Sequence, residues 1–282
     1  MSAAGGVGGR AADVSRLRHF GATLVAGFVV VRPPRPGIRQ APWPPRGHLV
    51  LGAVLAIAAV ACAMVLLDAW SLGSVRGLPA FVVVFFNNFT DLGLSGWFLY
   101  PLAFLLMVMA ALDSPAMARI DRGVLAAVAV RLGFVFAAIA VPGLFVALIK
   151  RVIGRARPFI DGHDSWAYAL FSWRPEYASM PSGHTTTAFA AAVAIGAIWP
   201  QMRPLMWVYA VLIAVSRVVV IAHHPSDVIA GALVGAIGAL LVRNWFASRR
   251  LGFAVGSDGG VRRLPGPSWR RIKTVARRLR SA

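Results

Sequence analysis

The stretch 49–67, LVLGAVLAIAAVACAMVLL, decides the class of fold. It holds nineteen consecutive residues without a charge, and Asp68 closes it. A helix crosses the hydrocarbon core of a bilayer with about 20 predominantly apolar residues, so this stretch predicts a transmembrane helix. It also contains Cys62, the single cysteine of the sequence, which excludes an internal disulfide and a cysteine-based metal site.

Five further apolar runs follow the first one. They cover residues 92–112, 124–149, 184–199, 205–222 and 228–245. The last three are short, so tilt and local thinning of the bilayer must accommodate them. We therefore predict an all-α fold, an integral membrane six-helix bundle over residues 49–246. An irregular basic extension (1–48) precedes it and a basic tail (247–282) follows it.

Composition agrees with a membrane protein and locates the charge. Hydrophobic residues make up 58% of the 282 residues and charged residues 14%, whereas soluble domains have about 45–50% and about 25%. The net charge of +19 comes largely from the two ends, with seven arginines before residue 47 and eleven Lys and Arg from Arg243 onward. Because neither end carries a nucleic-acid-binding motif, we expect anionic headgroups as their partner and no nucleic acid.

The extension contains a shorter apolar segment, GATLVAGFVVV at 21–31. Eleven residues are too few to cross the bilayer core. Arg16 and Arg18 precede the segment, as in a signal peptide, but Arg32 and two prolines follow it in place of a small-residue cleavage site. We expect it to stay uncleaved.

Positive charge in the connections sets the expected orientation. With the amino end inside, the connection 113–123 is cytoplasmic and holds Arg119 and Arg122, whereas the outside loop 68–91 holds only Arg76. We thus expect a multi-pass protein of the inner (plasma) membrane with both ends in the cytoplasm. The outside connection 150–181 breaks the pattern, and phosphate binding would explain its cations, which are Lys150, Arg151, Arg155, Arg157 and Arg174.

Two features inside the spans predict packing. Arg131 lies about two turns inside the cytoplasmic end of the third span, and we expect its side chain to snorkel toward the surface. Gly231 and Gly235 form a GxxxG pair in the sixth span, a spacing that allows close contact between helices.

Three polar segments lie at span ends, and the first is KRVIGRARP at 150–158. Lys150 precedes Arg157 by seven residues, about two helical turns, so both cations can lie on one face at the outer end of the third span. A basic membrane border explains this segment equally well when it is taken alone.

The second polar segment is MPSGH at 180–184, where the fourth span begins. Pro181 suits the entry to a helix, and Ser182 can cap it. Gly183 would let backbone amides approach an anion at the helix N-terminus. His184 would lie at the rim, where it can deliver a proton. Taken alone, a capped helix start with a chance histidine is the simpler interpretation.

The third polar segment is SRVVVIAHHPSD at 216–227. Arg217 places a cation near the end of the fifth span. His223 and Asp227 are four residues apart, so in a helix the carboxylate could orient the imidazole and leave the other ring nitrogen free to attack. His224 is three residues from Asp227 and could compete for it. A histidine pair at a membrane border is more often interfacial.

The three segments fall on the same side of the membrane in the predicted topology. Their candidate site residues include three cations (Lys150, Arg157 and Arg217), two histidines, a carboxylate and an anion-binding helix start. Phosphoryl transfer uses these groups: cations and amides neutralise the phosphate oxygens, one histidine attacks, and another protonates the leaving oxygen.

The combined pattern K-x6-RP, PSGH and SR-x5-H-x3-D resembles the signature of the type 2 phosphatidic acid phosphatase superfamily, the lipid phosphate phosphatases. All eleven specified positions are met, and they are Lys150, Arg157, Pro158, Pro181, Ser182, Gly183, His184, Ser216, Arg217, His223 and Asp227.

The resemblance implies a role for each matching residue. It makes His223, and not His224, the nucleophile, with Asp227 supporting it and His184 as proton donor. It also implies a phosphate site formed by Lys150, Arg157, Ser182, Gly183 and Arg217. Members of the family need no metal, and we expect no metal or other cofactor.

The expected function is hydrolysis of a phosphomonoester or diphosphate on a lipid through a phosphohistidine, at a site facing the periplasm. Transfer to a second lipid would make the protein a phosphotransferase, and a transporter of anionic lipid would need no histidine pair. Six spans argue against the soluble vanadium haloperoxidases of the superfamily. The motifs do not choose among phosphatidic acid, phosphatidylglycerol phosphate, undecaprenyl diphosphate and lipid A 1-phosphate, and they leave the oligomeric state unknown.

The charge distribution yields a test of orientation. A reporter enzyme that is active only outside the cytoplasm, fused after Ala282, should be silent, because the basic tail is retained on the inner side. A strong signal would invert the topology and place all three polar segments in the cytoplasm.

Overall fold

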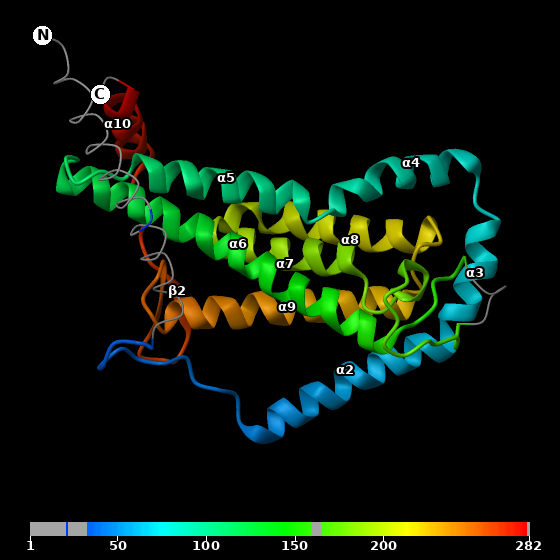
Figure 1. The fold of residues 1–282 in the computed structure, drawn as a ribbon. Coiled ribbons are helices and arrows are strands. Elements are labelled where there is room, and N and C mark those ends of the chain that lie inside the picture. The colour runs from blue at the N-terminus through cyan, green and yellow to red at the C-terminus, as the bar shows by residue number, and fades with distance from the viewer. Residues whose placement is uncertain (1–20, 22–32, 160–164, 281–282) are drawn as a thin grey trace, which may run out of the picture. The chain divides into compact units, whose positions relative to one another are not determined.

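Helices account for nearly all of the regular structure (Figure 1). The computed structural model describes residues 21, 33–159 and 165–280. Apart from Gly21, the predicted apolar segment 21–31 lies outside these residues. The helices are α2 (Arg46–Leu66), α3 (Asp68–Arg76), α4 (Ala80–Thr90), α5 (Gly96–Leu112), α6 (Arg119–Ile153), α7 (Gly183–Ile198), α8 (Arg203–Val219), α9 (Pro225–Ala247) and α10 (Trp269–Arg280).

Short elements complete the described chain. The 3-10 helices are η2 (Asp91–Gly93), η4 (Pro175–Tyr177) and η5 (Pro200–Met202). Strands β1 (Phe253–Val255) and β2 (Val261–Arg263) pair antiparallel, with Ala254 opposite Arg262.

Six helical stretches of the described residues match the predicted spans. Five are long and apolar enough to cross a membrane, by length and composition: α2, the stretch Ala80–Leu112, α6, Pro200–Val219 and α9. The sixth, α7, is apolar but has only 16 residues. Each predicted span overlaps one of these stretches, so the all-α membrane fold class is confirmed.

The prediction that residues 68–91 form a loop is wrong. The structure has helices α3 and α4 there, and η2 links α4 to α5. Asp68 opens α3, where its carboxylate is favoured by the partial positive charge of a helix N-terminus. The apolar part of α4 is too short to be recognised as a span, but α4 continues through η2 into the apolar α5.

The chain forms two compact units, which we describe separately. The larger unit consists of Pro42–Leu99 and Phe134–Asn244, and the smaller unit contains the described parts of Met1–Ala41, Tyr100–Gly133 and Trp245–Ala282. In the larger unit α7 is buried along most of its length, and its small side chains let α8 pack along it. The fully buried alanines of α7 are Ala188, Ala190, Ala191, Ala192 and Ala194.

Helix α9 approaches the start of α7 through its glycines. A Cβ added at Gly231 would collide with the carbonyl oxygen of Ser182, and one added at Gly235 would collide with that of Thr186. The hydroxyl of Thr186 donates to the carbonyl of Gly231 at 3.1 Å. The close helix contact predicted from the GxxxG spacing is confirmed, and it joins two helices of one chain.

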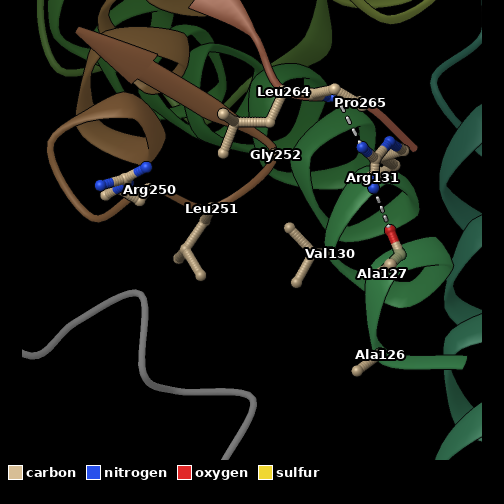
Figure 2. Close-up of a pocket in the computed structure, with 9 residues that line it drawn as sticks. All are labelled: Ala126, Ala127, Val130, Arg131, Arg250, Leu251, Gly252, Leu264 and Pro265. Atoms are coloured by element: carbon tan, nitrogen blue, oxygen red, sulfur yellow. Dashed lines mark hydrogen bonds between the residues drawn. The ribbon is translucent and has the colours of Figure 1, made fainter. Parts of the chain in front are cut away.

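In the smaller unit, Arg131 fastens the segment that follows β2 (Figure 2). Its guanidinium donates to the carbonyls of Ala127 at 2.7 Å and Leu264 at 3.0 Å. The side chain therefore points back toward the start of α6, as expected of a snorkelling arginine. It borders a pocket of about 240 Å³ whose other lining residues are Ala126, Ala127, Val130, Arg250, Leu251, Gly252, Leu264 and Pro265.

Helix α10 is anchored in the same unit. The guanidinium of Arg278 donates to both carboxylate oxygens of Asp121, at 3.1 and 3.0 Å. Its apolar Val275 is buried, whereas Trp269 is exposed.

The close contact between α9 and α7 predicts that a larger residue at Gly235 will destabilise the protein. In Gly235→Ala the new methyl group would meet backbone, which cannot move aside, so the free energy of unfolding should fall by about 1–3 kcal/mol. The matched control is Gly143→Ala on α6, where an added Cβ meets nothing within 4 Å. Thermal unfolding of the purified proteins in detergent measures both, and equal midpoints for the two variants would contradict the packing described here.

Candidate active site

The end of α6 presents the first two predicted cations. Lys150 lies in the last turn of the helix, and Gly154 ends it with a φ of 59°, its amide donating to the carbonyl of Lys150 at 3.0 Å. A side chain at Gly154 would collide with the carbonyl of Ala169, so glycine is required both by φ and by space. Arg157 follows, and its Nε donates to the carbonyl of Pro175 at 3.2 Å.

The PSGH segment begins α7 as predicted, but Ser182 does not use its hydroxyl as a cap. Ser182 occupies the N-cap position and is fully buried. Its hydroxyl accepts a hydrogen bond from Thr185 at 3.0 Å instead of binding a backbone amide. The first amides of a helix have no acceptor within the helix, so the start of α7 keeps donors for an anion. A Cβ added at Gly183 would lie 3.7 Å from Lys150 Nζ, which places that cation beside the helix start.

His184 lies among the charged groups of the other two segments. The charges that act on its ring belong to Arg217, His223, Lys150 and Arg157. Its ring packs against Gly93 of η2, where an added Cβ would lie 3.1 Å from the ring Cδ2. The end of the α4–α5 connection, which the sequence analysis left out of the site, therefore fixes the position of this histidine.

Arg217 is held by α4 and keeps one buried donor unused. Its Nη1 donates to Thr90 Oγ1 at 2.7 Å, and the hydroxyl of Ser216 donates to the same oxygen at 3.0 Å. Within the described part of the chain, Arg217 Nε and His224 Nδ1 are the buried side-chain atoms that lack a hydrogen-bond partner. A buried, unpartnered guanidinium donor suits an anion that is bound at this point.

The expected direct contact between Asp227 and His223 is not formed. His223 Nδ1 lies 3.8 Å from Asp227 Oδ2, beyond hydrogen-bond distance, and 3.4 Å from Ser179 Oγ. Ser179 in turn donates to Asp227 Oδ2 at 2.6 Å. The serine hydroxyl thus contacts both the carboxylate and the imidazole from one side, and the three atoms form a triangle. Sequence reasoning missed Ser179, because nothing in the motif spacing marks it.

The two adjacent histidines differ in their surroundings. The backbone amide of His224 donates to Asp227 Oδ2 at 3.0 Å, and its Nδ1 lies 3.4 Å from that oxygen. His224 therefore does compete for the carboxylate, as the spacing allowed. The charges that act on His223, in contrast, include the cations Arg217 and Arg157. This places His223 beside the groups that would hold an anion.

Burial controls the protonation of His223, which lies between α8 and α9. Burial lowers the pKa of its imidazole to about 4; the Asp227 carboxylate opposes this shift, and Arg217 adds to it. The ring is therefore neutral at pH 7 and keeps a lone pair on one nitrogen, as a nucleophile requires.

The explanation of the outside cations by phosphate binding does not extend to all five. Arg155 is turned to two buried carboxylates, those of Asp68 and Asp227, at 2.7 Å each. Arg151 donates to the carbonyls of Trp173 and Arg174 and so ties the loop to α6. Arg174 pairs with Glu176 on the exposed surface. The explanation therefore still applies to Lys150 and Arg157, which lie beside His184 and the start of α7.

All eight predicted site residues thus meet at one end of the larger unit. They come from α6 and the loop after it, from α7, from α8 and from α9. Among the described residues, no group of three or more His, Cys, Asp or Glu side chains could hold a metal ion. The arrangement offers cations and helix amides for an anion, a neutral buried imidazole, and a second imidazole nearby.

The family comparison covers the same part of the chain. Residues 131–251 match the family model described as PAP2 superfamily. A lipid A 1-phosphatase of Rhizobium johnstonii is 39% identical over 127 residues, which cover 45% of this chain and 52% of that protein. The enzyme of the same name from Rhizobium etli is 36% identical, covering 45% and 55%. The chain therefore spans about half the length of these relatives.

Other similar proteins act on, or are named for, different lipids. The decaprenylphosphoryl-5-phosphoribose phosphatase of Mycobacterium tuberculosis is 37% identical over 105 residues, covering 35% of this chain and 55% of that protein. Among solved structures, Aquifex aeolicus LpxE is 25% identical, with a TM-score of 0.43 over 59% of this chain and 88% of that one. The transmembrane PAP2 type phosphatidylglycerolphosphate phosphatase of Bacillus subtilis is 22% identical, with a TM-score of 0.48 over 70% and 92%.

The burial of His223 predicts its titration. Followed by NMR of ¹³C-labelled histidine rings, the His223 signal should titrate near pH 4 instead of at the ordinary value of about 6.5. Asp227→Asn should move the midpoint lower still, because the carboxylate favours the imidazolium. His223→Gln identifies the signal by its disappearance. A midpoint near 6.5 would show that the ring is solvated and would contradict the geometry.

Proposed function

Because residues 131–251, which contain all three polar segments, match the PAP2 superfamily model, we propose that the chain is a membrane lipid phosphatase of this family acting through a phosphohistidine. One observation carries the proposal: three cations lie close to the start of α7 and to the histidines His184 and His223. The cations are Lys150, Arg157 and Arg217. The multi-pass membrane character of the chain agrees with a lipid substrate.

In this mechanism His223 attacks phosphorus with Nε2. Its Nδ1 faces both Ser179 Oγ and the Asp227 carboxylate, which together favour the proton on Nδ1. A P–N bond forms as the bond from phosphorus to the lipid oxygen breaks. His184 gives a proton to that oxygen, and the lipid leaves as an alcohol or, from a diphosphate, as a phosphate monoester.

Water then completes the reaction. His184, now neutral, accepts a proton from the water that attacks phosphorus, the P–N bond breaks, and inorganic phosphate leaves. In both steps negative charge builds on the phosphoryl oxygens. Lys150, Arg157, Arg217 and the amides at Gly183 and His184 would stabilise it, and such donors act more strongly in a site that excludes water.

We propose the 1-phosphate of lipid A as the first substrate to test. The support is the name of the Rhizobium relatives, which are 39% and 36% identical over 127 residues. Because the mycobacterial relative is named for a polyprenyl lipid, undecaprenyl diphosphate is also included among the substrates to test. We also propose that the site faces the periplasm from the inner membrane, because both basic ends are expected in the cytoplasm.

A lipid panel tests the proposal. Purified protein in mixed micelles with EDTA is given lipid A, phosphatidic acid, phosphatidylglycerol phosphate or undecaprenyl diphosphate, and inorganic phosphate is measured. Release from lipid A supports the full proposal, and release from another lipid alone overturns the choice of substrate. Phosphate that moves to a second lipid without release would make the protein a phosphotransferase. Binding without either reaction would indicate a transporter.

The two histidine roles make different predictions. His223→Ala should abolish turnover on every substrate, because the covalent intermediate cannot form. His184→Ala should slow the first step by about 10²–10⁴-fold, the usual contribution of positioned proton transfer. A substrate with a good leaving group needs little protonation, so it should recover much of the loss in His184→Ala and none in His223→Ala.

The neighbouring histidine is the matched control. His224→Ala should keep substantial activity, and acid-labile phosphate trapped on the wild-type protein should map to His223. Label on His224, or normal turnover by His223→Ala, would contradict the assignment.

A further inference from the structure

A buried arginine at an unspecified position of the first motif connects two carboxylates behind the site. Arg155 is 1% exposed. Its Nη1 donates to Asp227 Oδ1 at 2.7 Å, and its Nη2 donates to Asp68 Oδ2 at 2.7 Å. Nε and Nη2 also donate to the carbonyl of Ser165, at 3.1 and 2.7 Å, and Nη1 to Ser226 Oγ at 2.6 Å.

Backbone contacts on both sides of Arg155 also hold this residue in place. It follows Gly154, which ends α6, and it pairs with Tyr168 across an isolated antiparallel bridge. The amide of Ala169 donates to the carbonyl of Gly154 at 2.7 Å, and that of Ala156 to the carbonyl of Ala167 at 2.9 Å. These backbone hydrogen bonds hold the loop in the position from which the Arg155 guanidinium reaches the carboxylates.

Asp68 links the same arginine to the start of α9. Its Oδ1 accepts the amide of Ser226 at 3.0 Å and its Oδ2 accepts the hydroxyl of Ser226 at 2.6 Å. Asp68 is fully buried, as is Asp227 one residue after Ser226. The first residue of α3 therefore holds the turn that carries Asp227.

These bonds leave the Asp227 carboxylate with no freedom to rotate. Oδ1 accepts from Arg155, and Oδ2 accepts from Ser179 and from the amide of His224. Charge adds a second constraint. Asp227 and Arg155 alone would be neutral as a pair, so the negative charge of Asp68 is what leaves a net charge of −1 behind His223.

Buried ion pairs add little to stability on average, because desolvation offsets their attraction. A cluster of three buried charges therefore needs a reason other than folding energy. Its position directly behind the Ser179–His223 contact supplies one, since a nucleophilic imidazole becomes positively charged as it attacks.

We propose that Asp68 and Arg155 are positioning residues: both hold Asp227 in place, and Asp68 keeps the cluster negative, so that His223 is oriented and its developing positive charge is stabilised. The inference rests on the proposed phosphohistidine chemistry. Other titratable or charged groups around Asp227 and His223 come from every neighbouring element; they are Lys150, Arg157, Tyr168, His184, Arg217 and His224.

The test compares Asp68→Asn, Arg155→Gln and Arg155→Lys with the wild-type protein. Asp68→Asn removes a negative charge, so the acid limb of kcat/KM should move to lower pH. Arg155→Gln removes a positive charge, so the limb should move to higher pH, and each shift should be about 1 unit, as neighbouring charges commonly produce. In both variants kcat should fall about 10-fold while KM changes little, because the phosphate ligands are untouched. Arg155→Lys should return the limb toward its wild-type position.

The matched control is Arg174→Gln. Arg174 also pairs with a carboxylate, that of Glu176 at 3.7 Å, but on the exposed surface. It should keep the wild-type kcat and pH profile. Binding of vanadate to each variant shows that the protein is folded. Folded Asp68→Asn and Arg155→Gln with an unmoved acid limb and wild-type kcat would overturn the proposal.

Failure of the proposed function can be told apart from failure of this inference. If the wild-type protein releases no phosphate from any lipid, the function is overturned. The NMR titration of His223 still reports the cluster in that case. Opposite shifts in Asp68→Asn and Arg155→Gln would support the positioning role, and identical titrations in all three proteins would exclude it.

Discussion

The amide of Ser182 donates to the carbonyl of Asp227 at 3.0 Å, and this one bond joins the starts of α7 and α9. It forms only because Gly231 and Gly235 let the two backbones approach, since any side chain there would meet the carbonyls of Ser182 and Thr186. The start of α7 and the Asp227 carboxylate are thereby set at a fixed separation. Helix α8, packed along the small side chains of α7, brings Arg217 to the same place.

Polar side chains inside a membrane protein are held by other polar groups, because lipid offers no substitute for water. The described site follows this rule in two layers. Thr90 holds Arg217, and Ser179 contacts both Asp227 and His223. Behind them, Arg155 is paired with the carboxylates of both Asp68 and Asp227. The unused donor of Arg217 stands out against this background, because almost every other buried polar atom of the described residues has a partner.

The same burial that makes the charged cluster costly makes the imidazole reactive. A solvated histidine is partly protonated near neutral pH, whereas burial keeps His223 neutral. The carboxylate behind it works in the opposite direction and favours the imidazolium. An imidazole that is neutral before attack, with negative charge waiting behind it, is suited to forming a bond to phosphorus.

The sequence by itself determined the helical membrane class and predicted the residues that we propose as the site. Apolar runs of span length identify membrane helices because the bilayer leaves few alternatives, and the spacing of Lys150, Arg157, His184, Arg217, His223 and Asp227 marks phosphoryl transfer. The sequence pattern did not reveal helices α3 and α4, and the apolar part of α4 is shorter than a span.

Only the tertiary structure decided what supports those residues. Asp68 and Arg155 are 87 residues apart, and Arg155 and Asp227 are 72 apart. In the sequence, Asp68 closes an apolar run, and Arg155 is a further cation in a basic segment. Local patterns report the neighbours along a helix, but a buried charge takes its meaning from the group that faces it, and that group is chosen by how distant segments pack.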